Sequence, residues 1–272
     1  MNRIVFLGTG GGRHVMFSQA RRTGGLYFEL ENNNDITRFI IDPGPGSLIY
    51  SHILGLHPEN WNGILLSHYH VDHSNDVNVI LDGIKKPFLI AEEHCIKYNK
   101  NNEYPCISKY HKDLVKNLYA VKHGDIINLN NIKIHAIKSN HHAPCVGFKI
   151  IHEKFSIGYP SDGSYYSGQE KFYENCDIII LNVLVPKGES WPEGRHMSID
   201  GAISLIKNMK SRPRLCILNH LSFWMMRSNV FKQAKMIQDA TKVKTIHVDD
   251  FTELNLDDMT IKKFDVNIIV KK

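Results

Sequence analysis

Leu65–Asp76 reads LLSHYHVDHSND, a polar burst of three histidines and two aspartates directly behind an apolar run. The apolar residues predict a short buried strand that ends where the histidines begin. His68 and His70 are two positions apart, so in an extended chain they point the same way. Asp72 and His73 follow, where the chain is expected to turn towards a helix. The strand end therefore presents two imidazoles, and the next turn presents a carboxylate and a third imidazole.

The spacing H-x-H-x-D-H favours a metal site over an ordinary polar loop. Neutral imidazole and carboxylate are the ligands that zinc and similar divalent ions take. A single histidine after a strand would usually only form hydrogen bonds, but three with an aspartate among them make a different pattern. We expect two metal ions lying close together to use all four groups.

The composition indicates a soluble globular protein. The chain has 272 residues, of which 42% are hydrophobic and 22% charged. This length suits one large α/β domain or two small ones. No apolar run approaches the roughly 18 residues that a membrane-spanning helix needs, so no membrane contact is expected. The opening MNRIVFLGTGGG lacks the long apolar region of a signal peptide and reads as a first strand.

Cysteines and charge set further limits. The five cysteines are scattered, without a C-x-x-C pair, which argues against a disulfide framework and against a cysteine-type zinc site. Reduced thiols in a cytoplasm fit best, so a cytoplasmic protein is expected. The net charge of +5 is compatible with an anionic substrate, but a lysine-rich solvated surface explains it as well. The count of 16 histidines is high for this length.

Short apolar runs alternate with turn signals, and longer stretches show helical spacing. A single domain over residues 1–272 is the simplest interpretation, with two sheets packed face to face and helices outside. The segments NKNNEYP (99–105) and PKGESWPEGR (186–195) read as long irregular loops. The expected strands are RIVFLG, LYFEL, TRFIID, GILLS, FLIA, IKIHAI, VGFKII, FSIGY, DIIILNV, RLCILN, TIHV and VNIIV. The expected helices are Ser47–Leu54, Asn75–Leu81, Ser108–Asn117, Tyr165–Asn175, Ile199–Met209 and Asn229–Ala240.

The histidine motif, His68-Tyr69-His70-Val71-Asp72-His73, resembles the H-x-H-x-D-H signature of the metallo-β-lactamase superfamily. The segments FLGTGGG and IDPGPG extend this resemblance over nearly the whole chain. The resemblance implies a four-layer αββα sandwich, an α/β fold with the metals at one edge of the two sheets. It also implies that Asp42 supports the metal-binding loop without binding metal, although a turn aspartate before Pro43 explains the same residue.

The superfamily has a later histidine ligand, and two adjacent histidines compete for that role in IHAIKSNHHAPCVGF. In members related to ribonuclease Z the ligand precedes a Gly-aromatic pair by six positions. His141 stands six positions before Gly147 and is therefore chosen over His142. We expect His142 to be a neighbour near the pocket that points elsewhere, because side chains alternate between faces in an extended chain.

The bridging aspartate and the closing histidine of the superfamily also have counterparts. Asp162, in FSIGYPSDGSYY, matches the family's Y-x-S-D, although alone it would read as a turn before Gly163. His220, in RLCILNHLSF, resembles the closing T-H-x-S with Asn219 in place of threonine. The resemblance thus implies one ion on His68, His70, His141 and Asp162, and a second on Asp72, His73, Asp162 and His220. Zinc is the default for such a site, with manganese and iron as alternatives.

Two metal ions about 3.5–4 Å apart hold a bridging water and lower its pKa from 15.7 towards about 7, which supplies a hydroxide nucleophile. Such a centre hydrolyses phosphodiesters, lactones, thioesters or lactams. The catalytic candidates are Asp72 and His196. His196 lies in GRHMSIDG, which resembles the G-H-M/N-S/T segment of ribonuclease Z and related phosphodiesterases, where the histidine contacts the phosphate and helps the leaving oxygen depart. A helix-capping loop with an incidental histidine is the alternative, and Arg195 replaces the family's glycine.

The predicted function is a dinuclear-metal-dependent hydrolase of phosphodiester bonds, in RNA or in a small cyclic or nucleotide phosphodiester. Two alternatives are a hydrolase of a lactone or thioester, and a non-catalytic metal-containing RNA-binding protein. The expected partners are an anionic small molecule or an RNA substrate, and a homodimer is allowed for. Residues 83–125 lack the Gly/Pro-rich arm with which long ribonuclease Z proteins grip tRNA. Trp191 and Trp224 are candidates for the pocket entrance.

Overall fold

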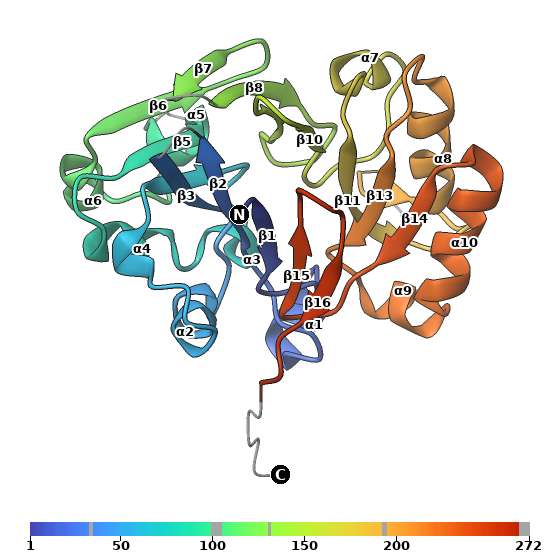
Figure 1. Ribbon diagram of the computed structural model, residues 1–272, viewed down its shortest axis with the longest axis horizontal. Coiled ribbons are helices and arrows are strands. Elements are labelled where there is room, and N and C mark those ends of the chain that lie inside the picture. The colour runs from blue at the N-terminus through green and yellow to red at the C-terminus, as the bar shows by residue number, and fades with distance from the viewer. Residues whose placement is uncertain (33–34, 99–104, 130–131, 192–194, 267–272) are drawn as a thin grey trace.

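Two β-sheets packed face to face form the centre of the protein, as Figure 1 shows. The computed structural model describes residues 1–32, 35–98, 105–129, 132–191 and 195–266. Within these residues the first sheet has the strand order β16-β15-β1-β2-β3-β4-β5-β6, and the second has the order β14-β13-β11-β10-β9-β8-β7, with β12 paired to β11. The strands of the first sheet are β1 (Arg3–Phe6), β2 (Leu26–Asn32), β3 (Asp35–Ile41), β4 (Gly63–Leu66), β5 (Phe88–Glu92), β6 (Asn117–Val121), β15 (Thr252–Asn255) and β16 (Ile261–Lys263). Those of the second are β7 (Ile126–Leu129), β8 (Ile132–Lys138), β9 (Val146–Ile151), β10 (Ser156–Tyr159), β11 (Ile178–Val185), β12 (Met197–Ser198), β13 (Leu215–Asn219) and β14 (Lys244–His247).

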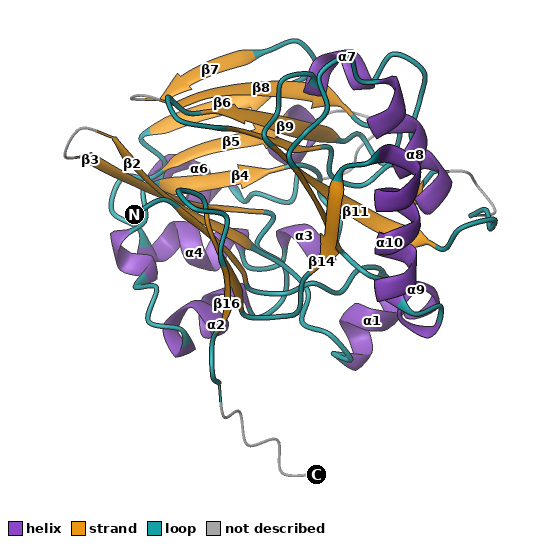
Figure 2. Ribbon diagram, turned by 45° about the vertical axis from the view of Figure 1, so that its right-hand side comes forward, coloured by secondary structure: helices purple, strands orange, loops and turns teal. Residues whose placement is uncertain are grey.

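Helices cover the outer faces of both sheets, so the chain has four layers (Figures 1 and 2). The helices α2, α4 and α6 lie beside the first sheet, whereas α7, α8, α9 and α10 lie beside the second. None of the helices among the described residues combines the length and the apolar composition needed to cross a membrane. The helices are α1 (Arg13–Ser18), α2 (Ser47–Ile53), α3 (Val71–Ser74), α4 (Val77–Gly83), α5 (Glu93–Ile96), α6 (Lys109–Leu114), α7 (Glu170–Tyr173), α8 (Ile199–Asn208), α9 (Phe223–Arg227) and α10 (Val230–Thr241), with a 3₁₀ turn, η1, at Pro58–Asn60.

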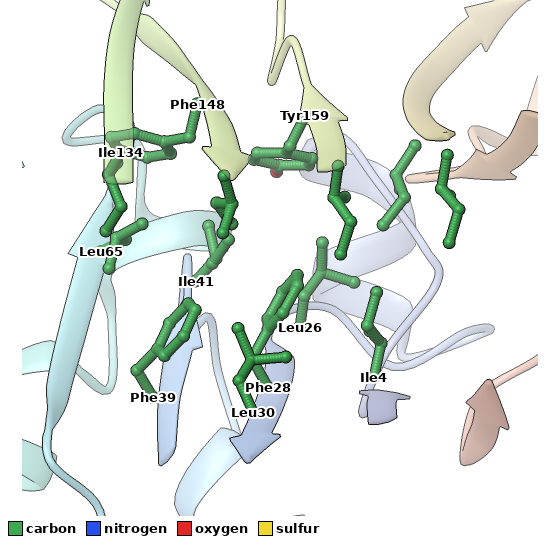
Figure 3. Close-up of a cluster of buried hydrophobic side chains, with 14 of the residues drawn as sticks. Ile4, Leu26, Phe28, Leu30, Phe39, Ile41, Leu65, Ile134, Phe148 and Tyr159 are labelled. Atoms are coloured by element: carbon green, nitrogen blue, oxygen red, sulfur yellow. The ribbon is translucent and has the colours of Figure 1, made fainter. Parts of the chain in front are cut away.

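The core between the sheets is apolar and aromatic, and Figure 3 shows part of it. Phe28 and Phe39 stack across β2 and β3 with ring centroids 4.9 Å apart. Ile134 and Phe148 reach in from the opposite sheet. Strand residues that face away from this core are buried under the helices instead, which explains why the strands read as continuous apolar runs.

Strand direction brings distant parts of the sequence together at one edge. β3, β4, β5 and β6 run parallel in the first sheet, and β10, β11, β13 and β14 run parallel in the second. β8 and β10 are both antiparallel to β9, so they share a direction. The carboxyl ends of parallel strands meet at the same edge of a sheet, and ligand sites form there.

The predicted fold class, the four-layer αββα sandwich, is confirmed. Each predicted helix overlaps an observed one, but two predictions were too long. Ser108–Asn117 ends early as α6, because Val115 adopts an extended conformation and the Lys116 N–H donates to the Pro87 carbonyl beside β5. Tyr165–Asn175 contains only the short helix α7. The single-domain interpretation of residues 1–272 stays a prediction.

The elements that sequence patterns missed are short or polar. α3, α5 and α9 have four or five residues, too few for a 3.6-residue period to appear. The strand β15 (TELN) has no apolar alternation and forms because it pairs with β1 in register. The predicted strand VNIIV (266–270), except for its first residue, and parts of the two predicted loops lie outside the described residues.

Candidate metal centre

The predicted metal ligands lie just beyond strand ends at the shared sheet edge. Asp42 follows β3, and the H-x-H-x-D-H motif follows β4. From the second sheet, His141 follows β8, Asp162 follows β10 and His220 follows β13. The fold therefore brings together side chains that are as many as 178 positions apart in the sequence, from Asp42 to His220.

Three imidazoles form the first cluster. The Nδ1 atom of His70 lies 3.0 Å from Nε2 of His68 and 3.2 Å from Nε2 of His141. Atoms bound about 2.0–2.1 Å from a tetrahedral zinc ion lie roughly 3.3 Å from one another. The three nitrogens therefore have the spacing of ligands around one small cation.

The second cluster contains Asp72, His73 and His220, and the carboxylate of Asp162 lies next to it. The Nε2 atom of His220 lies 3.6 Å from Asp72 Oδ2 and 3.4 Å from Asp162 Oδ2. Nε2 of His73 lies 3.6 Å from the same Asp162 oxygen. The Nε2 atoms of His73 and His220 are buried without a hydrogen-bond partner, although an unpaired buried polar atom is costly. A cation between these groups would satisfy both nitrogens.

Hydrogen bonds on the far side of each ring fix which nitrogen faces the centre. The Nδ1 of His141 donates to the Arg195 carbonyl at 3.2 Å, and that of His73 donates to Asp42 Oδ2 at 3.0 Å. Ser67 Oγ donates its proton to Asp42, so the His68 Nδ1 donates to Ser67 Oγ at 2.9 Å. Since Nδ1 holds a proton in all three rings, Nε2 is the atom that each ring turns towards the centre and through which it would bind a metal.

Asp42 is the hub that holds this arrangement. Its carboxylate accepts hydrogen bonds from the Ser67 N–H at 2.7 Å, from Ser67 Oγ at 2.7 Å and from the Tyr159 hydroxyl at 2.8 Å, besides that from His73. It bonds to residues of both sheets, so it is more than a turn aspartate before Pro43. These contacts are the ones expected of a residue that supports the metal-binding loop, as the superfamily resemblance implied.

The electrostatics of the cluster suit a cation. Burial lowers the pKa of His68 well below its ordinary value and that of His70 to about 4, so both rings are neutral at neutral pH. Burial alone would raise the pKa of Asp162, but the charges of His220 and His73 outweigh it and hold that pKa well below its usual range. Neutral imidazoles and ionised carboxylates are the protonation states that metal binding requires.

His73 differs from His68 and His70, because the negative charges around it favour its protonated form. Burial lowers its pKa, but the carboxylates of Asp162, Asp72 and Asp42 outweigh burial and raise it well above the ordinary value. A proton on His73 thus balances the carboxylates around it. A divalent ion in the second cluster would supply this charge and displace the proton, so the residues present fit a pair of divalent cations.

The sequence model of the family described as "Beta-lactamase superfamily domain" matches residues 37–221, which is more than half of the chain. The chain belongs to this superfamily. A protein of Methanocaldococcus jannaschii, described as uncharacterized, is 29% identical over 250 residues, which are 89% of this chain and 91% of that protein. The probable metallo-hydrolase YhfI of Bacillus subtilis is 24% identical over 196 residues, which are 71% of this chain and 79% of YhfI.

Solved structures agree on the fold. The crystal structure of YhfI superposes with a TM-score of 0.73 at 18% identity and covers 92% of this chain and 97% of its own. The short form of human tRNase Z superposes with a TM-score of 0.67 at 16% identity, covering 93% of this chain and 99% of its own. The predicted superfamily is confirmed, and so is the prediction of an enzyme of the metallo-hydrolase kind. The solved structures confirm the fold, and the ribonuclease Z-like branch stays a prediction.

Two glycines let the backbone of this superfamily member approach its polar centre. A Cβ on Gly11 would lie 2.2 Å from Cδ2 of His220, and one on Gly44 would lie 2.1 Å from the Asp72 carbonyl oxygen. Real Cβ atoms essentially never come so close, so a side chain at either position would displace a cluster residue. The segment GTGGGR (8–13) therefore passes directly against the site.

His196 and His142 lie at the periphery of the two clusters. Nδ1 of His196 is buried without a hydrogen-bond partner, 3.9 Å from Asp162 Oδ2, and burial lowers the pKa of its imidazole to about 4. The ring of Trp191 packs against His196 with centroids 4.7 Å apart. His142 is exposed, and its ring lies 4.6 Å from that of His70. His142 is therefore a neighbour of the first cluster, as expected, but strand alternation is not the reason for its direction, because β8 ends at Lys138.

Asn182 is a member of the site that sequence reasoning missed. Its Nδ2 donates to Asp162 Oδ1 at 2.8 Å and lies 3.1 Å from the Tyr159 hydroxyl. The other oxygen of Asp162 is therefore the one that faces His73 and His220. A signal was present in the sequence, because Asn182 interrupts the apolar strand IIILNVLV, and a buried amide needs partners.

Proposed function

We propose that this protein is a dinuclear-metal-dependent hydrolase of phosphodiester bonds, acting on RNA or on a small nucleotide phosphodiester. The observation that carries the proposal is the pair of donor clusters that both lie within reach of the Asp162 carboxylate, with His196 beside it. The superfamily membership and the likeness to human tRNase Z, a protein of the same fold, support it.

His68, His70 and His141 would hold one ion, and Asp72, His73 and His220 the other, with Asp162 shared between them. Zinc is the first expectation for ligands so rich in histidine, with manganese and iron as alternatives. Bound divalent ions lower the pKa of a coordinated water and neutralise charge that develops on substrate oxygens. His196 also lies near Asp162, as His73 and His220 do, but we assign it to neither group of three metal ligands.

His196 is proposed to donate a proton to the leaving oxygen. Burial lowers the pKa of its imidazole, so His196 is neutral in the free site; when an anionic substrate binds, its charge favours imidazolium and the ring takes up a proton from solvent. Trp191 packs against this ring and keeps it in place. Arg195 is exposed next to it and can pair with a phosphate, because guanidinium forks well onto phosphate oxygens.

Metal binding is expected to release protons at pH 7. The raised pKa of His73 means that this residue holds a proton in the metal-free protein, and the ion must displace it. The affinity for zinc should therefore fall as the pH is lowered, because the proton then competes better. Titration calorimetry of metal-free protein in two buffers of different ionisation enthalpy measures this release. Equal heats in both buffers would contradict the assignment of His73 as a ligand.

A substrate panel tests the function itself. Metal-loaded protein is assayed with bis-p-nitrophenyl phosphate, a dinucleotide, a lactone and a thioester, and each assay is repeated after treatment with a chelator. Phosphodiester hydrolysis that is lost on chelation and regained with metal is the expected result. Activity on the lactone or thioester alone would replace the proposal with the other hydrolase, and salt-sensitive RNA binding without turnover would indicate a non-catalytic RNA-binding protein.

The remaining expectations belong to the same proposal. An RNA substrate and a small anionic phosphodiester are its two substrate classes, and a cytoplasmic location and a homodimer stay predictions. Size-exclusion chromatography with light scattering measures the oligomeric state directly.

A further inference from the structure

The glycine loop, Gly8–Gly12, touches two of the proposed ligands of the second cluster. Its Gly11 lies against the ring of His220, and the Gly12 N–H donates to Asp72 Oδ2 at 3.2 Å. The loop also pairs with the residue after His220, because the Leu221 N–H donates to the Thr9 carbonyl at 2.7 Å and the Gly11 N–H donates to the Leu221 carbonyl at 3.1 Å. The position of His220 therefore depends on the position of this loop.

Both His220 and the glycine loop need neighbouring contacts that fix their conformation. His220 has a φ of 55°, a left-handed conformation that costs a non-glycine residue free energy and persists only where the surroundings impose it. The loop has four glycines around Thr9, and glycine loses more conformational entropy on ordering than any other residue. An anchor at Thr9 would fix the loop and, through Leu221, the turn at His220.

Asp250 provides this anchor. Its Oδ1 accepts hydrogen bonds from the Thr9 N–H at 2.8 Å and from the Thr9 hydroxyl at 2.7 Å, and its Oδ2 accepts one from the Arg22 N–H at 2.8 Å. Thr9 is completely buried, and Arg21 donates a further hydrogen bond to its hydroxyl at 2.7 Å. The Asp250 carboxylate thus accepts hydrogen bonds from both ends of the segment that connects β1 to β2.

We propose that Asp250 is a positioning residue of the metal centre, which acts through Thr9 and the glycine loop to place His220 and Asp72 for the second ion. This inference rests on the proposed function, because it assumes that the second cluster binds a cation. Asp250 and the glycine loop both lie outside residues 37–221, the part of the chain that the superfamily model matches. The partners of metal ligands typically change metal affinity 10–100-fold when they are replaced.

The test compares Asp250→Asn with a matched control, Asp257→Asn. Asp257 also ties the C-terminal segment to the first strand, because it accepts hydrogen bonds from the Asn2 N–H at 3.1 Å and Asn2 Nδ2 at 2.7 Å, but at the end of β1 away from the glycine loop. Zinc affinity and stoichiometry are measured by competition with a chromophoric chelator, alongside thermal unfolding and the cobalt absorption spectrum of each variant.

We expect Asp250→Asn to weaken one of two zinc sites about tenfold, to change the spectrum of the second cobalt ion and to lower kcat with little change in KM. Asp257→Asn should leave both sites as in the unaltered protein. Equal zinc affinity and spectra in the two variants would overturn the inference, whatever their unfolding temperatures. If Asp250→Asn does not fold, Thr9→Val carries the same expectation, because it removes the hydroxyl bond and keeps the backbone bond. Fewer than two zinc ions on the unaltered protein would instead overturn the proposed function.

Discussion

Asp162→Asn is expected to lower kcat for a phosphodiester by about 10³-fold or more, since the shared ligand of both ions is lost. Asn182 Nδ2 donates a hydrogen bond to Asp162 Oδ1, so the side chain at position 162 must present an acceptor to Asn182. The new amide must turn its oxygen towards Asn182 and its NH₂ group towards His73 and His220. A hydrogen-bond donor would then face the position of the cations.

Metal analysis and kinetics check this prediction together. The variant should bind less than two equivalents of zinc under conditions that saturate the unaltered protein. Asp177→Asn is the matched control, because Asp177 accepts hydrogen bonds from Ser156 at the opposite end of β10. Unchanged zinc stoichiometry in Asp162→Asn, with activity within tenfold of the control, would show that Asp162 is not a shared ligand.

His196→Ala has the second-largest expected effect, and its size should depend on the leaving group. General acid catalysis contributes about 10²–10⁴-fold, but only where the departing oxygen needs a proton. A dinucleotide, which releases a sugar hydroxyl, should lose roughly this factor. Bis-p-nitrophenyl phosphate should lose far less, because p-nitrophenolate leaves without protonation.

The ratio of the two losses is the quantity to measure, with zinc content determined in parallel. His142→Ala is the control, since it removes an exposed imidazole whose ring lies 4.4 Å from His141 and should leave the ratio unchanged. Equal losses on both substrates would exclude proton donation by His196. Loss of zinc from His196→Ala would instead assign His196 as a ligand, which its place near His141 and Asp162 would permit.

The features that the sequence predicts well are local ones. The spacing of His68, His70, Asp72 and His73 needs only one strand end and one turn, and the structure brings these side chains together. His141 could be chosen over His142 because it stands six positions before Gly147, the spacing that the resemblance to ribonuclease Z implies. In the structure His141 joins the first cluster, whereas His142 is exposed beside it.

The features that the sequence does not predict depend on strand order. Asn182 meets Asp162 because β10 and β11 are parallel neighbours, and no local pattern encodes that pairing. Asp250 meets Thr9 across 241 positions because the chain returns beside β1 just before β15. Such contacts follow from the three-dimensional pairing of distant segments, so a single sequence read along its length cannot supply them.

Anomalous diffraction from crystals of the zinc-loaded protein tests the central claim most directly. We predict two zinc peaks about 3.5–4 Å apart. One should lie among the nitrogens of His68, His70 and His141, the other among Asp72, His73 and His220, and an Asp162 oxygen should lie between them. Metal-replete crystals with no zinc among these side chains would contradict the account.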